Sequence, residues 1–387
     1  MLLTITGYRK LSDIAYLAND PLILRILSLR KLPSVSTLSR GLNLVTSDSV
    51  QKLRALCRRY VLGALISLPR ITLDFDGSVQ STTRHAEGSA IGYNKKKKGA
   101  RSYYPLFCTI AQTGQFLDMH HRPGNVHDSN GSTKFIQSCI EETRAALGSS
   151  TVMESRLDGA FFAEERIELL LEQNIEFTIS VPFHRLPELK FAVEARKRWN
   201  KIDDNWSFFE LEFAPQSWES TDNQRVIITR QKKRTLHKGP LQLDLFYPVS
   251  YEFDYQAIMT NKSLAAKSVI KFHHGRGVQE DLIGQAKNEA QMDYIPVKAR
   301  NGNQIYCLAA MFAHNITKRI QMDAFKPRTH KATPTRAPLW QFRDLKTLRN
   351  NLIRRAGKIV RPQGKLKLIV SATSRVERQM NEFLHAA

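Results

Sequence analysis

The sequence predicts an α/β fold in which helices flank a mixed sheet, and three observations lead to this prediction. First, 42% of the 387 residues are hydrophobic, which is enough for a substantial core. Second, the apolar pattern of residues 71–182 changes between period two and helical spacing, as it does where strands and helices follow one another. Third, residues 1–70 and 321–387 carry patterns typical of flanking helical segments.

The region 71–182 starts with the segment ITLDFDGS, in which apolar residues alternate with Thr72, Asp74 and Asp76. This alternation predicts a strand with one apolar face. Two more strands, SYYPLFCTIAQ and QFLDMHHR, meet near Gly114 as the strands of a hairpin do. A helix over 130–147, a strand that ends near Asp158, a second helix and another strand follow. The order βββαβαβ is that of a ribonuclease-H-like sheet, and order alone fits other α/β folds as well.

Five segments are expected along the chain. Short aromatic strands such as NWSFFELEFAP interrupt the α/β rhythm and indicate a β-rich insertion. The last helices of the core are expected from Gly275 onward and over 305–320, and a basic helix over 343–360. The expected segments are an N-terminal helical segment at 1–70, a first part of the core at 71–182, the insertion at 183–255, the remainder of the core at 256–320 and a basic C-terminal helical region at 321–387.

The charge of the chain indicates a polyanionic partner. It has 58 Lys and Arg residues against 36 Asp and Glu, a net charge of +22. No apolar run is long enough to span a membrane, so nucleic acid is the favoured polyanion. The four cysteines lie far apart without a CxxC pair, which argues against a disulfide framework or a zinc site. The start of the chain lacks the apolar stretch of an export signal, so a cytoplasmic protein is expected.

One motif combines a carboxylate with cations at helical spacing. His273, Arg276, Glu280 and Lys287 follow the pattern H-x2-R-x3-E-x6-K, which puts all four on one face of a helix. Such a face suits the binding of a metal together with phosphates. The alternative is a solvated face on which Arg276 and Glu280 pair at i, i+4 spacing.

Two strand-end aspartates favour the metal-site interpretation. Asp76 and Asp158 are expected at adjacent positions of the sheet, where they can converge with Glu280. Close carboxylates repel one another unless a divalent cation lies between them, and Mg²⁺ is the natural candidate. Asp74 shares the strand face of Asp76, so it stays open as a further ligand.

Further basic segments are candidates for contact with phosphates. A run of four lysines follows the first strand in a glycine-flanked loop, for which a solvated loop is the alternative. A cation-rich tail over 343–367 is also expected on DNA. The lysines of the run are Lys95, Lys96, Lys97 and Lys98.

Taken together, these motifs resemble the DDE transposases of bacterial insertion sequences, in the branch with a Tyr-Arg-Glu-Lys signature. LDFDGS resembles the strand of the family's first aspartate, RLDGAFF the turn of its second, and KFHHGRGVQEDLIGQAKNE its glutamate helix. The resemblance covers most of the chain and includes a β insertion between the second aspartate and the glutamate. His273 stands where the signature has Tyr, and the leading helical region is shorter than is usual in the family, as if a DNA-end-binding part were truncated.

The resemblance implies a function and a set of site residues. Asp76, Asp158 and Glu280 would be catalytic metal ligands for Mg²⁺, for which Mn²⁺ can substitute. His273, Arg276, Lys287 and the lysine run would contact DNA. The partners would be double-stranded transposon ends and target DNA, bound by a homodimer in the bacterial cytoplasm at the nucleoid. The alternatives are a nuclease without strand transfer and a catalytically decayed or repurposed DNA-binding protein.

Overall fold

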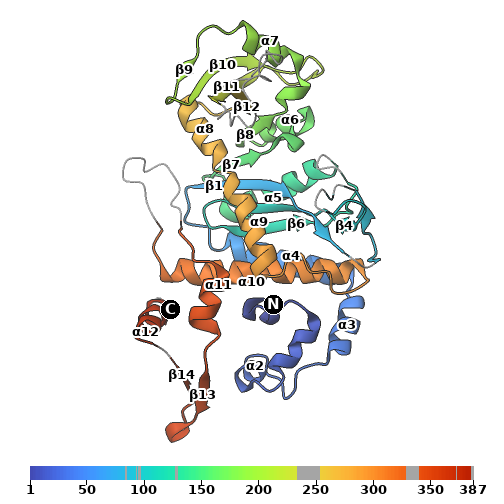
Figure 1. Ribbon diagram of the computed structural model, residues 1–387, viewed down its shortest axis with the longest axis vertical. Coiled ribbons are helices and arrows are strands. Elements are labelled where there is room, and N and C mark those ends of the chain that lie inside the picture. Colours follow the sequence, from blue (N-terminus) through green and yellow to red (C-terminus); the bar gives the residue numbers. More distant parts are fainter. Residues whose placement is uncertain are drawn as a thin grey trace, which may run out of the picture. The chain divides into compact units, whose positions relative to one another are not determined.

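The computed structural model shows a mixed α/β protein, as predicted, built from two compact units (Figure 1). Unit 1 comprises residues 1–152 and 278–387, and unit 2 comprises residues 153–277. The boundaries of these two units do not coincide with those of the five segments expected from the sequence. The division into five segments therefore stays a prediction. The structure describes residues 1–82, 85–92, 94, 97–126, 130–232, 253–327, 340–371 and 373–384.

Unit 1 contains three antiparallel strands that are hydrogen-bonded in the order β6-β5-β1. The expected hairpin is confirmed, because β5 pairs with β6 across a turn at Gly114, whose φ of 58° suits glycine. The buried residues of β1 run from Ile71 to Phe75, so the strand lies in the core and only its two ends reach solvent. The strands are β1 (Arg70–Gly77), β5 (Leu106–Ile110) and β6 (Gln115–His120).

Helices from distant parts of the chain cover this sheet. The apolar residues of α9 and α10 pack against Phe107, Phe116 and Met119 of β5 and β6 in one hydrophobic cluster. The long helix α10 confirms the helix expected over 305–320 and lies beside α4 (Figure 1). The main helices of unit 1 are α4 (Ser47–Leu62), α5 (Ser132–Leu147), α9 (Gly277–Glu289) and α10 (Arg300–Ala324).

Smaller elements complete unit 1. The N-terminal segment is helical, as predicted, and has its own apolar cluster around Leu17, Ile23 and Leu32. Three short strands form a small sheet in the order β2-β4-β3 after β1. These elements are α1 (Leu2–Thr6), η1 (Leu11–Leu17), α2 (Pro21–Ile26), α3 (Val35–Asn43), β2 (Gln80–Ser81), β3 (Ala90–Ile91) and β4 (Arg101–Tyr103).

Strand β6 is covered on one side by an amide of α10 rather than by another strand. The buried Asn315 side chain accepts a hydrogen bond from the Phe116 N–H and donates one to the Phe116 carbonyl, each at 2.8 Å. The side chain thus satisfies both main-chain groups of one strand residue, as a neighbouring strand would. His314 adds a hydrogen bond to the Gly114 carbonyl at 3.0 Å, so α10 follows β6 back to the turn.

A buried ionic cluster joins α4 to β6. Asp118 has no exposed side-chain surface and accepts hydrogen bonds from Arg54 at 2.7 and 2.6 Å and from Arg58. Arg58 also reaches Glu142 of α5 at 2.9 Å, so the cluster spans three elements. Two guanidinium groups compensate one buried carboxylate here, and removal of that carboxylate would leave them without their shared anion.

Unit 2 contains strands that are hydrogen-bonded in the order β7-β8-β12-β11-β10-β9. Among the described strands of this unit, β7 and β8 are parallel and the other pairs are antiparallel; β9 to β11 lie within the range 183–255 expected as a β-rich insertion. The core elements are β7 (Val152–Leu157), α6 (Glu164–Glu172), β8 (Glu176–Val181), β12 (Phe253–Thr260) and α8 (Ala266–His274). The other elements are η2 (Gly159–Phe161), η3 (Phe183–Arg185), α7 (Pro187–Ala195), β9 (Asn200–Lys201), β10 (Trp206–Phe213) and β11 (Gln224–Lys232).

The C-terminal region differs from the single basic helix expected over 343–360. Helical structure ends at Ile353, and the chain then forms a two-stranded antiparallel hairpin around a turn at Pro362–Gly364. The β-branched pair Ile359 and Val360 favours a strand over a helix, which explains the difference. The elements are α11 (Leu345–Leu348), η5 (Arg349–Ile353), β13 (Gly357–Val360), η6 (Pro362–Gly364), β14 (Lys367–Val370) and α12 (Ser374–Leu384).

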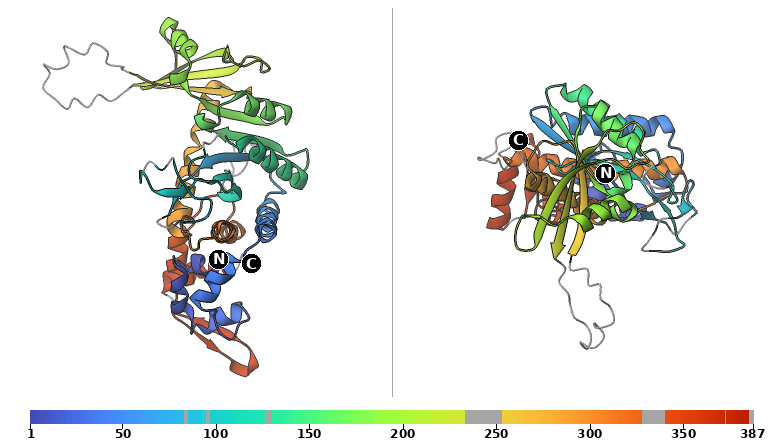
Figure 2. Two further views of the ribbon diagram at one scale, coloured as in Figure 1. Left: turned by 90° about the vertical axis from the view of Figure 1, so that its right-hand side faces the viewer. Right: turned by 90° about the horizontal axis from the view of Figure 1, so that it is seen from above.

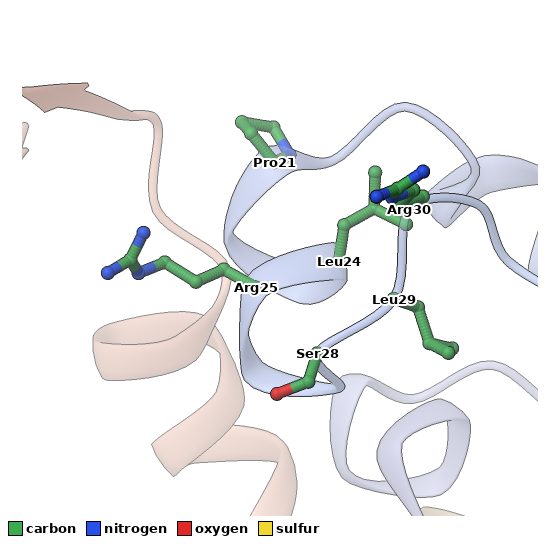
Figure 3. A pocket seen from close by; sticks show the side chains of 6 residues that line it. All are labelled: Pro21, Leu24, Arg25, Ser28, Leu29 and Arg30. Atoms are coloured by element: carbon green, nitrogen blue, oxygen red, sulfur yellow. The ribbon is translucent and has the colours of Figure 1, made fainter.

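Two surface properties of the described residues bear on function. None of the described helices is both long and apolar enough to cross a lipid bilayer. A shallow pocket at α2 is lined by two cations, one hydroxyl and apolar side chains, and the guanidinium groups of Arg25 and Arg30 point away from each other (Figure 3). This pocket contains none of the site residues predicted from the sequence, so the candidate site lies elsewhere.

We predict that Asp118→Asn lowers the free energy of unfolding by about 3 kcal/mol, because it removes the anion that Arg54 and Arg58 share. Chemical denaturation followed by circular dichroism measures this loss. The matched control is Asp48→Asn, which removes an exposed carboxylate that pairs with Lys52 in the first turn of α4 and is expected to cost under about 1 kcal/mol. Equal losses in the two variants would contradict the proposed importance of the cluster.

Candidate active site

The two aspartates of β1 differ in exposure. Asp74 is 2% exposed, whereas Asp76, two residues nearer the end of the strand, is half-buried. Asp76 Oδ1 accepts a hydrogen bond from the Gly77 N–H at 2.8 Å, which holds the carboxylate at the turn that leaves the strand. A ligand in solvent therefore has better access to Asp76 than to Asp74.

Glu280 lies in the first turn of α9, and its neighbour Gln279 attaches this turn to β1. Gln279 is 2% exposed, and its Nε2 donates a hydrogen bond to the Asp74 carbonyl at 2.8 Å. Glu280, one residue further on, is exposed to solvent. The hydrogen bond between Gln279 and Asp74 thus joins α9 to β1. Asp76 lies two residues after one partner, and Glu280 lies one residue after the other.

Lys287 brings a cation close to the chain segment that follows β1. Its Nζ donates a hydrogen bond to the Val79 carbonyl at 2.6 Å, three residues after Asp76. The same helix therefore holds Glu280 in its first turn and fixes Lys287 beside the exit of β1. An ammonium group at this place suits a phosphate close to the carboxylates.

Asp158 follows β7 directly and caps the short helix η2 in unit 2. Its Oδ1 accepts a hydrogen bond from the Ala160 N–H at 2.9 Å, and the residue is half-buried. Arg156, two residues earlier, donates a hydrogen bond to the Phe272 carbonyl at 3.1 Å and thereby attaches β7 to the end of α8. A Cβ atom at Gly275 would lie 2.3 Å from Arg156 Nη1, so a larger residue there would displace this guanidinium.

The motif that contains His273 is divided between two helices. It was expected on one face of one helix, but α8 ends at His274 and α9 begins at Gly277. Arg276 is therefore in the connecting turn and half-buried, and only Glu280 and Lys287 lie on α9. The pattern of spacing alone could not reveal this division.

His273 also differs from the expected DNA contact. The residue is 6% exposed, and its ring nitrogens form hydrogen bonds with Ser180 Oγ at 2.8 Å and Thr178 Oγ1 at 3.0 Å. Burial and the nearby charge of Arg276 lower the pKa of the ring to about 3. A neutral, buried imidazole with both nitrogens occupied packs α8 onto β8 and presents no group to a phosphate.

The predicted acids have the right chemistry for a hard divalent cation, since carboxylate oxygens are the ligands that Mg²⁺ prefers. Asp76 and Glu280 belong to unit 1, and Asp158 belongs to unit 2. Among the residues that the structure describes, no three His, Cys, Asp or Glu side chains gather closely enough to hold a metal ion. A metal site formed by all three acids therefore stays a prediction.

The lysine run is described only in part. Lys95 and Lys96 lie outside the described residues, whereas Lys97 and Lys98 are exposed. The buried Asn94 fixes this loop, because its Nδ2 donates a hydrogen bond to Ser81 Oγ of β2 at 2.8 Å. The loop thus starts from a fixed point close in the chain to β1.

Comparison with known proteins identifies the family. The model described as "Transposase DDE domain group 1" matches residues 1–386. The chain belongs to this transposase family. Comparison with curated protein sequences gave no match.

One solved structure similar to this transposase-family chain is a piggyBac transposase in a synaptic complex with hairpin DNA, determined by cryo-EM. The TM-score is 0.42 at 12% sequence identity, and the alignment covers 82% of this chain. It covers 64% of the other chain, so this chain spans less than two thirds of the length of that transposase.

The sequence did not point to Gln279 as a residue of the candidate site. In a helix rich in charged residues, an amide looks like another solvated side chain, and its burial depends on β1, about 200 residues earlier. Its apolar neighbours in the helix, Leu282, Ile283 and Ala286, do mark the buried face. Helical spacing places Gln279 on that face, four residues before Ile283, and this was the available signal.

We predict that Gln279→Leu lowers the free energy of unfolding by about 1 kcal/mol, because the Asp74 carbonyl loses a buried hydrogen-bond donor. Urea denaturation measures the effect. Asn288→Leu is the matched control, since it removes an exposed amide from the same helix and is expected to change stability by less than about 0.5 kcal/mol. If both variants have wild-type stability, the amide does not hold α9 to β1.

We predict that the stability of unit 2 falls in acid because of His273. Its pKa is lowered in the folded state, so its contribution is full above the unfolded value near 6.5 and is lost as the pH falls toward 3. Between pH 7.5 and 5 this group alone should cost about 2 kcal/mol. Urea denaturation followed by the fluorescence of Trp199, Trp206 and Trp218 reports on this unit.

The variant His273→Gln should show a weaker pH dependence over this interval, whatever its stability at pH 7.5. His184→Gln removes an exposed imidazole of the same unit and should keep the wild-type slope. If His273→Gln has the same slope of unfolding free energy against pH as the wild type, the buried ring does not account for the acid sensitivity.

Proposed function

We propose that this chain cleaves and joins DNA at the terminal inverted repeats of a bacterial insertion sequence and so moves the element by excision and reinsertion. The observation that carries the proposal is the family match over residues 1–386. The contact between Gln279 and β1 supports it, because it brings the helix of Glu280 to the strand of Asp76 within one compact unit. The spacing of Arg276, Glu280 and Lys287 supports a place in the Tyr-Arg-Glu-Lys branch.

In this proposal the three acids act as metal ligands. Asp76 lies near the end of β1 and is partly accessible, and Glu280 is exposed on α9. Asp158 caps the short helix η2 after β7. When two Mg²⁺ or Mn²⁺ ions are bound, they supply activation of a water or 3′-hydroxyl and stabilisation of the leaving oxygen in an in-line phosphoryl transfer. Asp74, buried in β1, is the weaker candidate for a ligand.

The cations of the site would position the DNA. Lys287 is fixed beside the exit of β1, where its ammonium can neutralise an end phosphate. Arg276, in the turn before α9, and the exposed Lys97 and Lys98 are further proposed contacts with phosphates. The net charge of +22 favours association with duplex DNA, and we propose a homodimer that holds two transposon ends in the cytoplasm.

Metal-dependent cleavage tests the proposal. The purified protein is incubated with a plasmid that carries its coding sequence and flanking DNA, with Mg²⁺ or with EDTA. We expect nicks at the boundaries of the element with Mg²⁺ and none with EDTA. Glu280→Gln should lower the rate at least about 100-fold, because a metal ligand loses its charge.

Asp281→Asn is the control, because it removes a neighbouring exposed carboxylate of the same helix and should retain cleavage. Equal activity of Glu280→Gln and wild type would exclude the assigned role. Salt-sensitive DNA binding without cleavage would instead indicate a DNA-binding protein, and cleavage without joined products would indicate a nuclease that lacks strand transfer.

A further inference from the structure

The hairpin β13–β14 has an anchored base and an exposed end. Arg349 Nε donates a hydrogen bond to the Ile5 carbonyl at 2.8 Å, and Arg349 Nη2 donates one to the Glu289 carbonyl at 2.7 Å. Arg354 Nε donates one to the Thr6 carbonyl at 2.8 Å. Beyond these anchors, the hairpin extends away from α10 and α11 of the same unit (Figures 1 and 2).

The two faces of the hairpin have different compositions. Residues opposite one another in an antiparallel pair share a face, and neighbours along a strand alternate. The pairs Ile359–Leu368 and Gly357–Val370 therefore form a wholly apolar face, on which Ile359 and Val370 are half-buried. The pairs Lys358–Ile369 and Val360–Lys367 form the other face, which carries two lysines and is exposed at three of its four positions.

Positive charge is concentrated in this part of the chain. Residues 345–376 contain nine Lys and Arg residues and no Asp or Glu. Arg349 and Arg354 are used as anchors, whereas four exposed cations lie on the hairpin and its turn. These hairpin cations are Lys358, Arg361, Lys365 and Lys367. Within the described part of the chain, none of the four forms an ion pair with a carboxylate.

We propose that the β13–β14 hairpin binds duplex DNA as a two-stranded ribbon, with the hairpin cations on the phosphates. A two-stranded ribbon fits the major groove of B-form DNA, and an acid-free cationic surface releases counterions when it binds. The exposed side chains of Leu366 and Ile369, 43% and 57% accessible, would lie against the walls of the groove. This inference rests on the proposed function, since it takes DNA as the partner.

The test is DNA binding by the full chain in EDTA, where cleavage does not interfere. A fluorescent 30-base-pair duplex of arbitrary sequence is titrated at 50–200 mM salt. The hairpin variant carries Lys358→Gln, Arg361→Gln, Lys365→Gln and Lys367→Gln. We expect the slope of log K against log salt to fall by about 2 to 4, and the affinity at 0.1 M salt to fall at least about tenfold.

A charge-matched control separates the hairpin from the net charge. It carries four substitutions at exposed lysines elsewhere, Lys190→Gln, Lys197→Gln, Lys267→Gln and Lys298→Gln. The control should keep most of the affinity, and both variants should keep the wild-type melting temperature. Equal losses in the two variants would overturn the proposal, because binding would then depend on net charge alone.

Two further outcomes are decisive. The first is a hairpin variant that keeps its affinity for DNA but no longer binds vesicles of phosphatidylserine and phosphatidylcholine. This result would overturn the proposal, because the partner of the hairpin would then be a membrane surface rather than DNA. The second outcome is that the wild-type protein does not nick DNA, but the hairpin variant still loses DNA binding and the control variant does not. This result would support the hairpin proposal and contradict the proposed cleavage.

Discussion

The hydrogen bond from Gln279 to the Asp74 carbonyl connects the two parts of unit 1 on which the candidate site depends. One partner lies in the strand that leads to Asp76, and the other lies beside Glu280 in α9. Both groups are buried, so the bond is shielded from water and restrains the separation of strand and helix. Lys287, two turns later, makes a second contact with the same segment, which fixes the rotation of α9 as well as its position.

The hydrophobic pattern and turn residues of short segments were enough to predict much of this fold, because contacts within these segments determine their structure. Period-two alternation located β1, and the turn at Gly114 located the hairpin β5–β6. The burial of His273 could not be found in this way, because it depends on Ser180 and Thr178, more than 90 residues earlier. The position of Asp158 relative to the other acids likewise depends on tertiary structure rather than on spacing.

In the C-terminal region, the spacing of the cations predicted a helix where the structure has a hairpin. Closely spaced cations such as Arg354 and Arg355 resemble the polar face of a basic helix, but they also occur where a chain begins a hairpin. The decisive features were the β-branched pair Ile359 and Val360 and the turn residues that follow, Pro362 and Gly364. Charge composition therefore indicated the polyanionic partner, while side-chain branching determined the shape that presents the charge.

The amide of Asn315 has a consequence for the order in which this protein can be made. Strand β6 is synthesised almost 200 residues before the side chain that pairs with Phe116, and all of unit 2 is translated in between. A growing chain therefore carries an open strand edge until α10 leaves the ribosome. A chain that ends before this helix would keep that edge unpaired, and an unpaired strand edge can pair with another chain.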